Sequence, residues 1–120
     1  MQLEGERILM RIHISENDKF DGDSLSSRII TLLRERRFAG ATLFRGAMSF
    51  GPNAKLHTDR MELMALDLPV VVECVETEDN IRKVLPDLDR MIGGGLITLE
   101  RANVVMYRSG ASGENAGDRS

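Results

Sequence analysis

Residues 69–92 read PVVVECVETEDNIRKVLPDLDRMI, a β-branched run followed at once by a helical pattern. The valine-rich residues 70–76 come directly after Pro69 and predict a strand, because β-branched side chains fit the pleated surface of a sheet. Thr77 caps the helix that follows, and Pro86 predicts a kink or a restart within it. The apolar stripe of this helix consists of Ile81, Val84, Leu85, Leu88, Met91 and Ile92.

The N-terminal part of the chain repeats this order of a strand and then a helix. In residues 7–14 every second residue is apolar, and the residues between them are mostly polar. This alternation predicts a half-buried strand. Residues 15–22 are polar and acidic and predict a loop, after which Asp23 or Ser24 caps a helix that ends at Gly40. The side chains expected to face the core are Ile8, Met10, Ile12 and Ile14 of the strand and Leu25, Ile29, Leu32 and Leu33 of the helix.

Two more strands are predicted, one before a loop in the middle of the chain and one after the glycines at 93–95. Residues 42–50 are predicted to form a strand. Residues 61–66 are predicted either to continue this strand past a loop or to start a short helical turn. After the glycines at 93–95, apolar residues again occupy every second position. They shift from odd to even positions near residues 101–103, which predicts a bulge or two short strands.

The resulting order β-α-β-loop-β-α-β is that of the split βαβ arrangement. The sequence therefore predicts the α+β class and a ferredoxin-like βαββαβ sandwich. We expect one domain over residues 1–108. Residues 109–120 are small and polar without an apolar anchor, and predict a disordered tail that is dispensable for stability.

Composition narrows the class of protein. The chain has 120 residues, of which 42% are hydrophobic and 29% charged, as in ordinary globular domains. A net charge of −3 and a pI near 5.4 argue against binding to nucleic acid or to anionic membranes. No apolar run approaches the roughly 20 residues of a membrane-spanning helix, and no signal-peptide pattern is present. The single cysteine, Cys74, cannot form an internal disulfide, so we expect a cytoplasmic protein.

One face of the predicted sheet is left without helices. Leu9, Val71 and Val75 lie on this bare face, together with Arg11 and Glu73, which we expect to pair with each other. Apolar side chains on an open sheet face require a partner, so the pattern predicts a homo-oligomer that packs sheet faces together.

A family resemblance rests on stretches that occur in a fixed order along the chain. They are RIHISEND at 11–18, AGATLFRG at 39–46, FG at 50–51 with HT at 57–58, LPVVVE at 68–73 and GGGLITL at 93–99. With them the chain resembles the PII-like family named domain of unknown function 190, within the PII and CutA-like superfamily. This resemblance implies a ferredoxin-like fold, a homotrimer, and small-molecule sites in the clefts between subunits.

The resemblance also implies a function. In PII proteins a flexible loop after the second strand and a glycine-rich loop after the second helix flank a nucleotide, and here these positions are residues 51–60 and 93–95. The expected function is signalling: a small anionic ligand, with an adenine nucleotide as one candidate, binds and alters the contact of a mobile loop with a partner protein. Because relatives are often encoded beside fluoride-export channels, a channel or transporter is one candidate partner.

The candidate ligand-binding residues combine backbone donors with positive charge. Glycines leave backbone N–H groups open to hold an anion, and a guanidinium offers a two-pronged donor. Among the basic residues, Arg45, which lies inside an apolar strand, is the one most expected to bind the ligand. The triple glycine also suits a plain helix-to-strand turn, and the charges also suit a solvated loop. The full set is Arg45, Gly46, Gly51, Lys55, His57, Arg60, Gly93, Gly94 and Gly95.

Other classes of function have weaker support in the sequence. No nucleophile occurs in a recognisable catalytic motif, so we do not expect an enzyme. His13, His57 and Cys74 lack the short spacing of zinc ligands, and Cys74 is expected to be a buried small hydrophobe. A CutA-like trimer that binds metal, or only assembles, remains the alternative. RNA-recognition domains share the strand order but stack bases on strand aromatics, which the strands at 7–14 and 70–76 lack.

Overall fold

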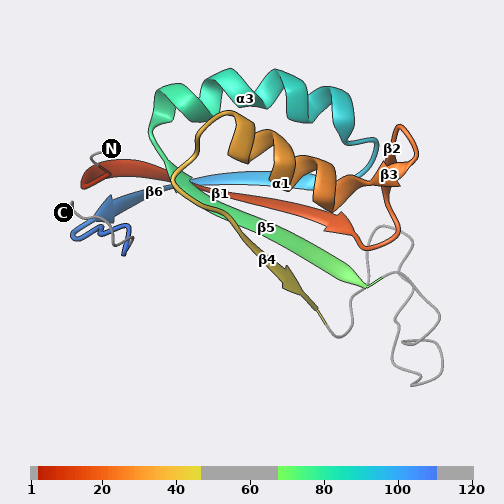
Figure 1. Cartoon of the computed structure of the whole chain (residues 1–120), viewed down its shortest axis with the longest axis horizontal. Coiled ribbons are helices and arrows are strands. Elements are labelled where there is room, and N and C mark those ends of the chain that lie inside the picture. Colours follow the sequence, from red (N-terminus) through yellow and green to blue (C-terminus); the bar gives the residue numbers. More distant parts are fainter. Residues whose placement is uncertain (1–2, 47–67, 111–120) are drawn as a thin grey trace.

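The computed structural model describes residues 3–46 and 68–110 (Figure 1). In these residues two helices cover one face of a four-stranded antiparallel sheet with the order β4-β5-β1-β6. The class and the arrangement are those predicted, α+β and ferredoxin-like. The elements are β1 (Gly5–Ser15), β2 (Lys19–Phe20), β3 (Asp23–Ser24), α1 (Leu25–Glu35), β4 (Thr42–Arg45), β5 (Pro69–Glu76), α3 (Glu78–Met91) and β6 (Leu96–Val104).

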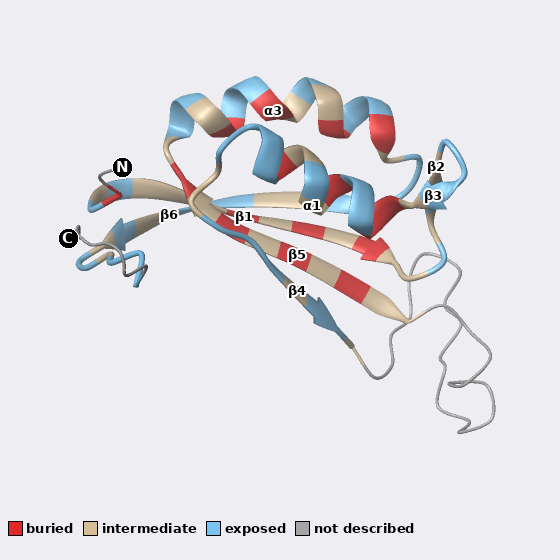
Figure 2. Ribbon diagram, viewed as in Figure 1, coloured by how far each residue is buried: buried red, intermediate tan, exposed pale blue. Residues whose placement is uncertain are grey.

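The two central strands show the predicted alternation. Along β5, and along β1 from Met10 onward, every second residue is buried beneath the helices, and the residues between them are half-buried on the bare face (Figure 2). Apolar side chains from both helices pack on the buried face of the sheet and complete the core. The core residues are Met10, Ile12, Ile14, Leu25, Ile29, Leu33, Val70, Val72, Cys74, Ile81, Val84, Leu88 and Met91.

Helix α1 begins as predicted and ends earlier than predicted. The Ser24 hydroxyl accepts a hydrogen bond from the Ser27 N–H at 3.4 Å and caps the first turn. The helix ends at Glu35 rather than at Gly40, because Arg37 adopts the left-handed conformation with φ of 61°. The prediction that Gly40 stops the helix was therefore wrong.

The segment between β1 and α1 contains a hairpin where a loop was predicted. Strands β2 and β3 pair antiparallel through Lys19 with Ser24 and Phe20 with Asp23. The turn residues Asp21 and Gly22 have φ of 52° and 82°, and two positive φ values are what a tight two-residue hairpin turn requires. An Asp-Gly pair is the sequence signal for this turn.

Helix α3 is capped as predicted and continues through its proline. The Thr77 hydroxyl accepts a hydrogen bond from the Asn80 N–H at 3.3 Å. The helix is continuous from Glu78 to Met91, so of the kink or restart predicted at Pro86 the restart does not occur. Pro86 and Arg82, whose carbonyl loses its usual donor, are both exposed, so that water can reach the freed carbonyl.

Strand β6 is unbroken where a bulge was predicted. It pairs with β1 in one register from His13 with Leu96 to Gly5 with Val104. Of the two residues that suggest the change of phase, Val104 is the last residue of the strand and Met106 lies beyond it and is 59% exposed.

Some predictions concern parts of the chain outside the described residues. These are the end of the strand predicted at 42–50, the ambiguous residues 61–66, and the tail from 111 onward. Within the described ranges, no helix is long and apolar enough to span a membrane.

Candidate functional site

The candidate ligand residues that the structure describes lie at one end of the sheet, which we call the loop end. Here β1 and β4 finish and β5 and β6 begin, as the antiparallel registers require (Figure 1). The described candidates at this end are Arg45, the last residue of β4, Gly46 directly after it, and the glycines 93–95 between α3 and β6. Gly51, Lys55, His57 and Arg60 lie outside the described residues.

The three glycines of the α3–β6 connection differ in what surrounds them. A side chain at Gly93 or Gly94 would meet no atom of the described residues within 4 Å, and both glycines are exposed. A Cβ at Gly95 would lie 2.6 Å from the carbonyl oxygen of His13, which is backbone of the central strand β1. Gly95 is therefore required by packing, whereas Gly93 and Gly94 are free to face a ligand.

A depression of about 260 Å³ adjoins these glycines. Its lining residues come from the end of α3 and the start of β6, and they are Leu88, Asp89, Ile92, Gly93, Gly94, Gly95, Leu96 and Ile97. The Asp89 carboxylate and the C-terminal end of the α3 dipole both make this depression electronegative. An anion held there needs the loop N–H groups together with basic side chains from elsewhere.

Arg45 and Gly46 both make contacts within the single chain, and these contacts explain their positions without a ligand. The Arg45 Nε lies 3.3 Å from the Glu16 carboxylate, although the Arg45 side chain remains 60% exposed. The Gly46 N–H donates to the Pro69 carbonyl at 2.8 Å, and a Cβ at Gly46 would lie 2.5 Å from the Pro69 ring. These contacts fix the β4 and β5 ends of the intervening chain, so Gly46 is explained by packing.

Within one subunit the structure does not bring Arg45 and the glycines together. Arg45 is on β4 and Gly95 precedes β6, and these strands are the two edges of the sheet. Three strand spacings separate them, roughly 14 Å. A ligand shorter than this distance cannot contact both groups within one chain.

The bare face contains the ion pair predicted from the sequence. The Arg11 Nε donates to Glu73 Oε2 at 2.8 Å, and an Arg11 terminal nitrogen lies 3.3 Å from Glu100 Oε1. The hydrogen bond to Glu73 raises the pKa of the Arg11 guanidinium. Both partners are about one-third exposed, so the pair is only half-buried in the single chain.

An apolar row crosses the bare face next to this pair. The registers place Phe44, Val71, His13 and Leu96 side by side on β4, β5, β1 and β6. Phe44 is 50% exposed and Leu96 is 57% exposed. Sequence analysis identified Leu9, Val71 and Val75 on this face but missed Phe44 and Leu96, because their face depends on the register of the edge strands.

Cys74 is the buried small hydrophobe expected. It is 5% exposed, and burial, with smaller contributions from Glu76 and Glu73, raises its pKa to about 12. A thiol with such a pKa stays protonated at neutral pH and is a poor nucleophile or metal ligand. Among the described residues, no three His, Cys, Asp or Glu side chains are grouped as a metal site.

A buried carboxylate that sequence analysis missed lies at the opposite end of the sheet. Glu76 is 0% exposed and accepts hydrogen bonds from the Ala39 N–H, the Thr77 N–H and the Asn80 amide at 3.0, 3.1 and 2.9 Å. The burial of Glu76 could have been predicted from the alternation along β5, because Glu76 lies on the same buried face as Val72 and Cys74. It ties the segment before β4 to the start of α3.

Comparison with known proteins identifies the family. The DUF190 profile, described as "Uncharacterized ACR, COG1993", matches residues 7–104, which include the sheet, both helices and the glycine loop. The chain belongs to the DUF190 family. Among related proteins, a UPF0166 protein of Methanocaldococcus jannaschii is 34% identical over 97 residues, covering 80% of this chain and 89% of the relative.

Two UPF0166 proteins of Aquifex aeolicus are also similar to this DUF190 chain. They are 32% and 28% identical over 97 and 99 residues, and the matches cover 91% and 97% of the relatives. The names of these relatives state no activity, so the function of the DUF190 chain has to be argued from its site.

Proposed function

We propose that this DUF190 protein is a cytoplasmic, PII-like regulatory protein rather than an enzyme. It binds a small anionic ligand, with an adenine nucleotide as the first candidate, in clefts between the subunits of a homotrimer. The ligand alters how residues 51–60 contact a partner protein, for which a channel or transporter is one candidate. The observation that carries the proposal is the open backbone of Gly93 and Gly94 beside a depression of about 260 Å³.

The electrostatics of the loop end support a site built from two subunits. The described lining of the depression is electronegative, so an anionic ligand needs positive charge from elsewhere. Lys55, His57 and Arg60 supply basic side chains in the sequence, and Arg45 lies at the opposite sheet edge from the glycines. A neighbouring subunit that presents its β4 edge would bring these groups to the glycine loop.

The bare face supports self-association. A half-buried ion pair and the row of Phe44, Val71, His13 and Leu96 offer a surface on which a second copy can pack. Covering this face would bury the Arg11–Glu73 pair fully. Removal of one member would then leave the other charge buried and unpaired, which is costly.

We therefore expect Glu73→Ala to weaken assembly, raising the dissociation constant of the homotrimer by roughly tenfold. Glu78→Ala is the matched control, because Glu78 lies at the exposed start of α3. Analytical ultracentrifugation over a range of protein concentrations measures both variants. A stable monomer for the native chain, or equal effects of the two substitutions, would contradict this assembly.

Ligand binding is tested by thermal-shift screening of nucleotides, second messengers and divalent metal ions, followed by calorimetry on any positive compound. We expect Gly94→Val to reduce the affinity for an anionic ligand by at least roughly tenfold while leaving the fold intact, because added bulk blocks the open backbone. Gly40→Val is the control, since a side chain at Gly40 also meets nothing within 4 Å but lies near the opposite end of the sheet. Unchanged affinity in Gly94→Val would refute the site, and stabilisation by metal ions alone would favour the CutA-like alternative.

A further inference from the structure

A second concave surface lies away from the loop end. It is a groove of about 290 Å³ between the second half of α1 and the segment that leads into β4. Its lining is mostly apolar and consists of Ile30, Leu33, Phe38 and the small residues 39–41, with Arg34 as the one charged residue among those described. The groove is at the C-terminal end of α1, about 16 Å along the helix axis from the loop end where α1 begins.

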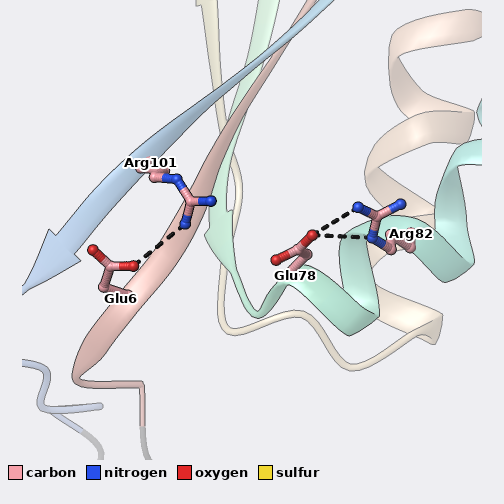
Figure 3. A network of polar contacts seen from close by, with 4 residues as sticks. All are labelled: Glu6, Glu78, Arg82 and Arg101. Carbon is pink, nitrogen blue, oxygen red and sulfur yellow. Dashed lines mark hydrogen bonds and ion pairs between the residues drawn. The ribbon is translucent and has the colours of Figure 1, made fainter.

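Two arginines beside this groove lack ion-pair partners among the described residues. Arg34 lines the groove, and Arg37 lies at the end of the same helix, directly before Phe38 of the groove wall. Other exposed arginines do have a partner, such as Arg82 with Glu78 at 2.8 Å and Arg101 with Glu6 at 3.3 Å (Figure 3). Two arginines without an ion pair among the described residues therefore lie next to an apolar groove, in a chain whose net charge is −3.

Arg37 occupies a backbone position that favours glycine. Its N–H donates to the Arg34 carbonyl at 3.0 Å and the Phe38 N–H donates to the Leu33 carbonyl at 3.0 Å, the pair of bonds that closes a Schellman motif. The central residue of this motif has positive φ, here 61°, where a side chain costs free energy. An arginine in this unfavourable conformation, beside an apolar groove, points to a role for its charge.

We propose that this groove docks an acidic peptide segment of a partner protein, anchored by an apolar side chain between α1 and residues 38–41. The groove is at the small end of the roughly 300–1,000 Å³ range of small-molecule sites, so it suits one anchoring side chain better than a whole cofactor. The charges of Arg34 and Arg37 complement carboxylates that flank the anchor. This surface is separate from the glycine loop and does not depend on a ligand there.

The test uses three fluorescein-labelled peptides and the full chain at low ionic strength, where surface charges are least screened. The first alternates leucine with glutamate, the second replaces every glutamate by lysine, and the third replaces every leucine by serine. Fluorescence anisotropy measures affinity, and amide NMR shifts locate the contact. We expect the leucine–glutamate peptide to bind and to shift the amides of residues 30–41, the lysine peptide not to bind, and the serine peptide to bind at least roughly tenfold more weakly.

Three variants separate this role from a structural one. Arg34→Glu should weaken binding of the acidic peptide by roughly tenfold, whereas Lys19→Glu, an equal change of charge on the distant hairpin, should leave it nearly unchanged. Arg37→Gly should raise the melting temperature by roughly 4 °C and still weaken binding. The proposal is overturned if the acidic peptide fails to bind, if the serine peptide binds equally well, or if Arg37→Gly stabilises the chain without loss of affinity.

Discussion

Replacing Glu76 by alanine is expected to lower the free energy of unfolding by about 3 kcal/mol. The Glu76 carboxylate is fully buried and accepts three hydrogen bonds, from the Ala39 N–H, the Thr77 N–H and the Asn80 amide. Alanine leaves all three donors without this acceptor and leaves a cavity between β5, α3 and the segment before β4. Buried donors without partners are costly, so the loss exceeds that of an ordinary surface carboxylate.

Two further variants identify the cause of the loss. Glu76→Gln keeps the size of the side chain, but its NH₂ group must face at least one donor, so we expect about half of the effect of alanine. Glu35→Ala removes an exposed carboxylate from the last turn of α1 and is expected to change stability by less than about 0.5 kcal/mol. Urea unfolding monitored by circular dichroism measures all three. Equal stability of Glu76→Ala and Glu35→Ala would show that the buried network is not important for folding.

The sequence predicts most of the fold because its central strands follow a strict alternation. On β1 and β5 the buried and half-buried positions fall where the pattern places them, and Ser24 and Thr77 cap the helices as expected. The end of helix α1 was predicted wrongly, because the sequence offers a glycine as an obvious helix stop. Gly40 was chosen as the helix stop because glycine favours left-handed backbone, but Arg37 adopts that conformation three residues earlier.

The candidate site is less predictable, because residue type does not reveal why a glycine is needed. Gly93, Gly94 and Gly95 are identical in sequence, yet only Gly95 lies against the backbone of β1. Gly46 was assigned to the ligand, whereas it also lies against the Pro69 ring. The Arg11–Glu73 pair was predictable from alternation, since both residues lie on the same face of neighbouring strands. The partners of Glu76 were not, since Ala39 is 37 positions away in the sequence.

The second prediction with a large effect is Gly95→Val, which we expect to lower the free energy of unfolding by about 3 kcal/mol or to prevent folding. A Cβ at this position would lie 2.6 Å from the His13 carbonyl oxygen and 3.1 and 3.2 Å from methyl groups of Ile92 and Ile14. The closest of these atoms is backbone of the central strand, held in register with both β5 and β6, so it cannot move without breaking the sheet. Gly94→Val, one residue earlier, should cost less than about 1 kcal/mol because its surroundings are open.

This contrast separates the two reasons for a triple glycine. Gly95→Ala is a smaller probe that adds the Cβ alone, and it should already destabilise the chain, because the short contact is with the Cβ itself. Chemical unfolding gives the stability of each variant, and calorimetry with a nucleotide identified by the screen gives its affinity. If Gly94→Val folds normally but loses the ligand while Gly95→Ala is unstable, then Gly94 is needed for binding and Gly95 for packing. Equal stabilities of Gly94→Val and Gly95→Val would mean that β1 can yield at His13 and that the packing argument for Gly95 is wrong.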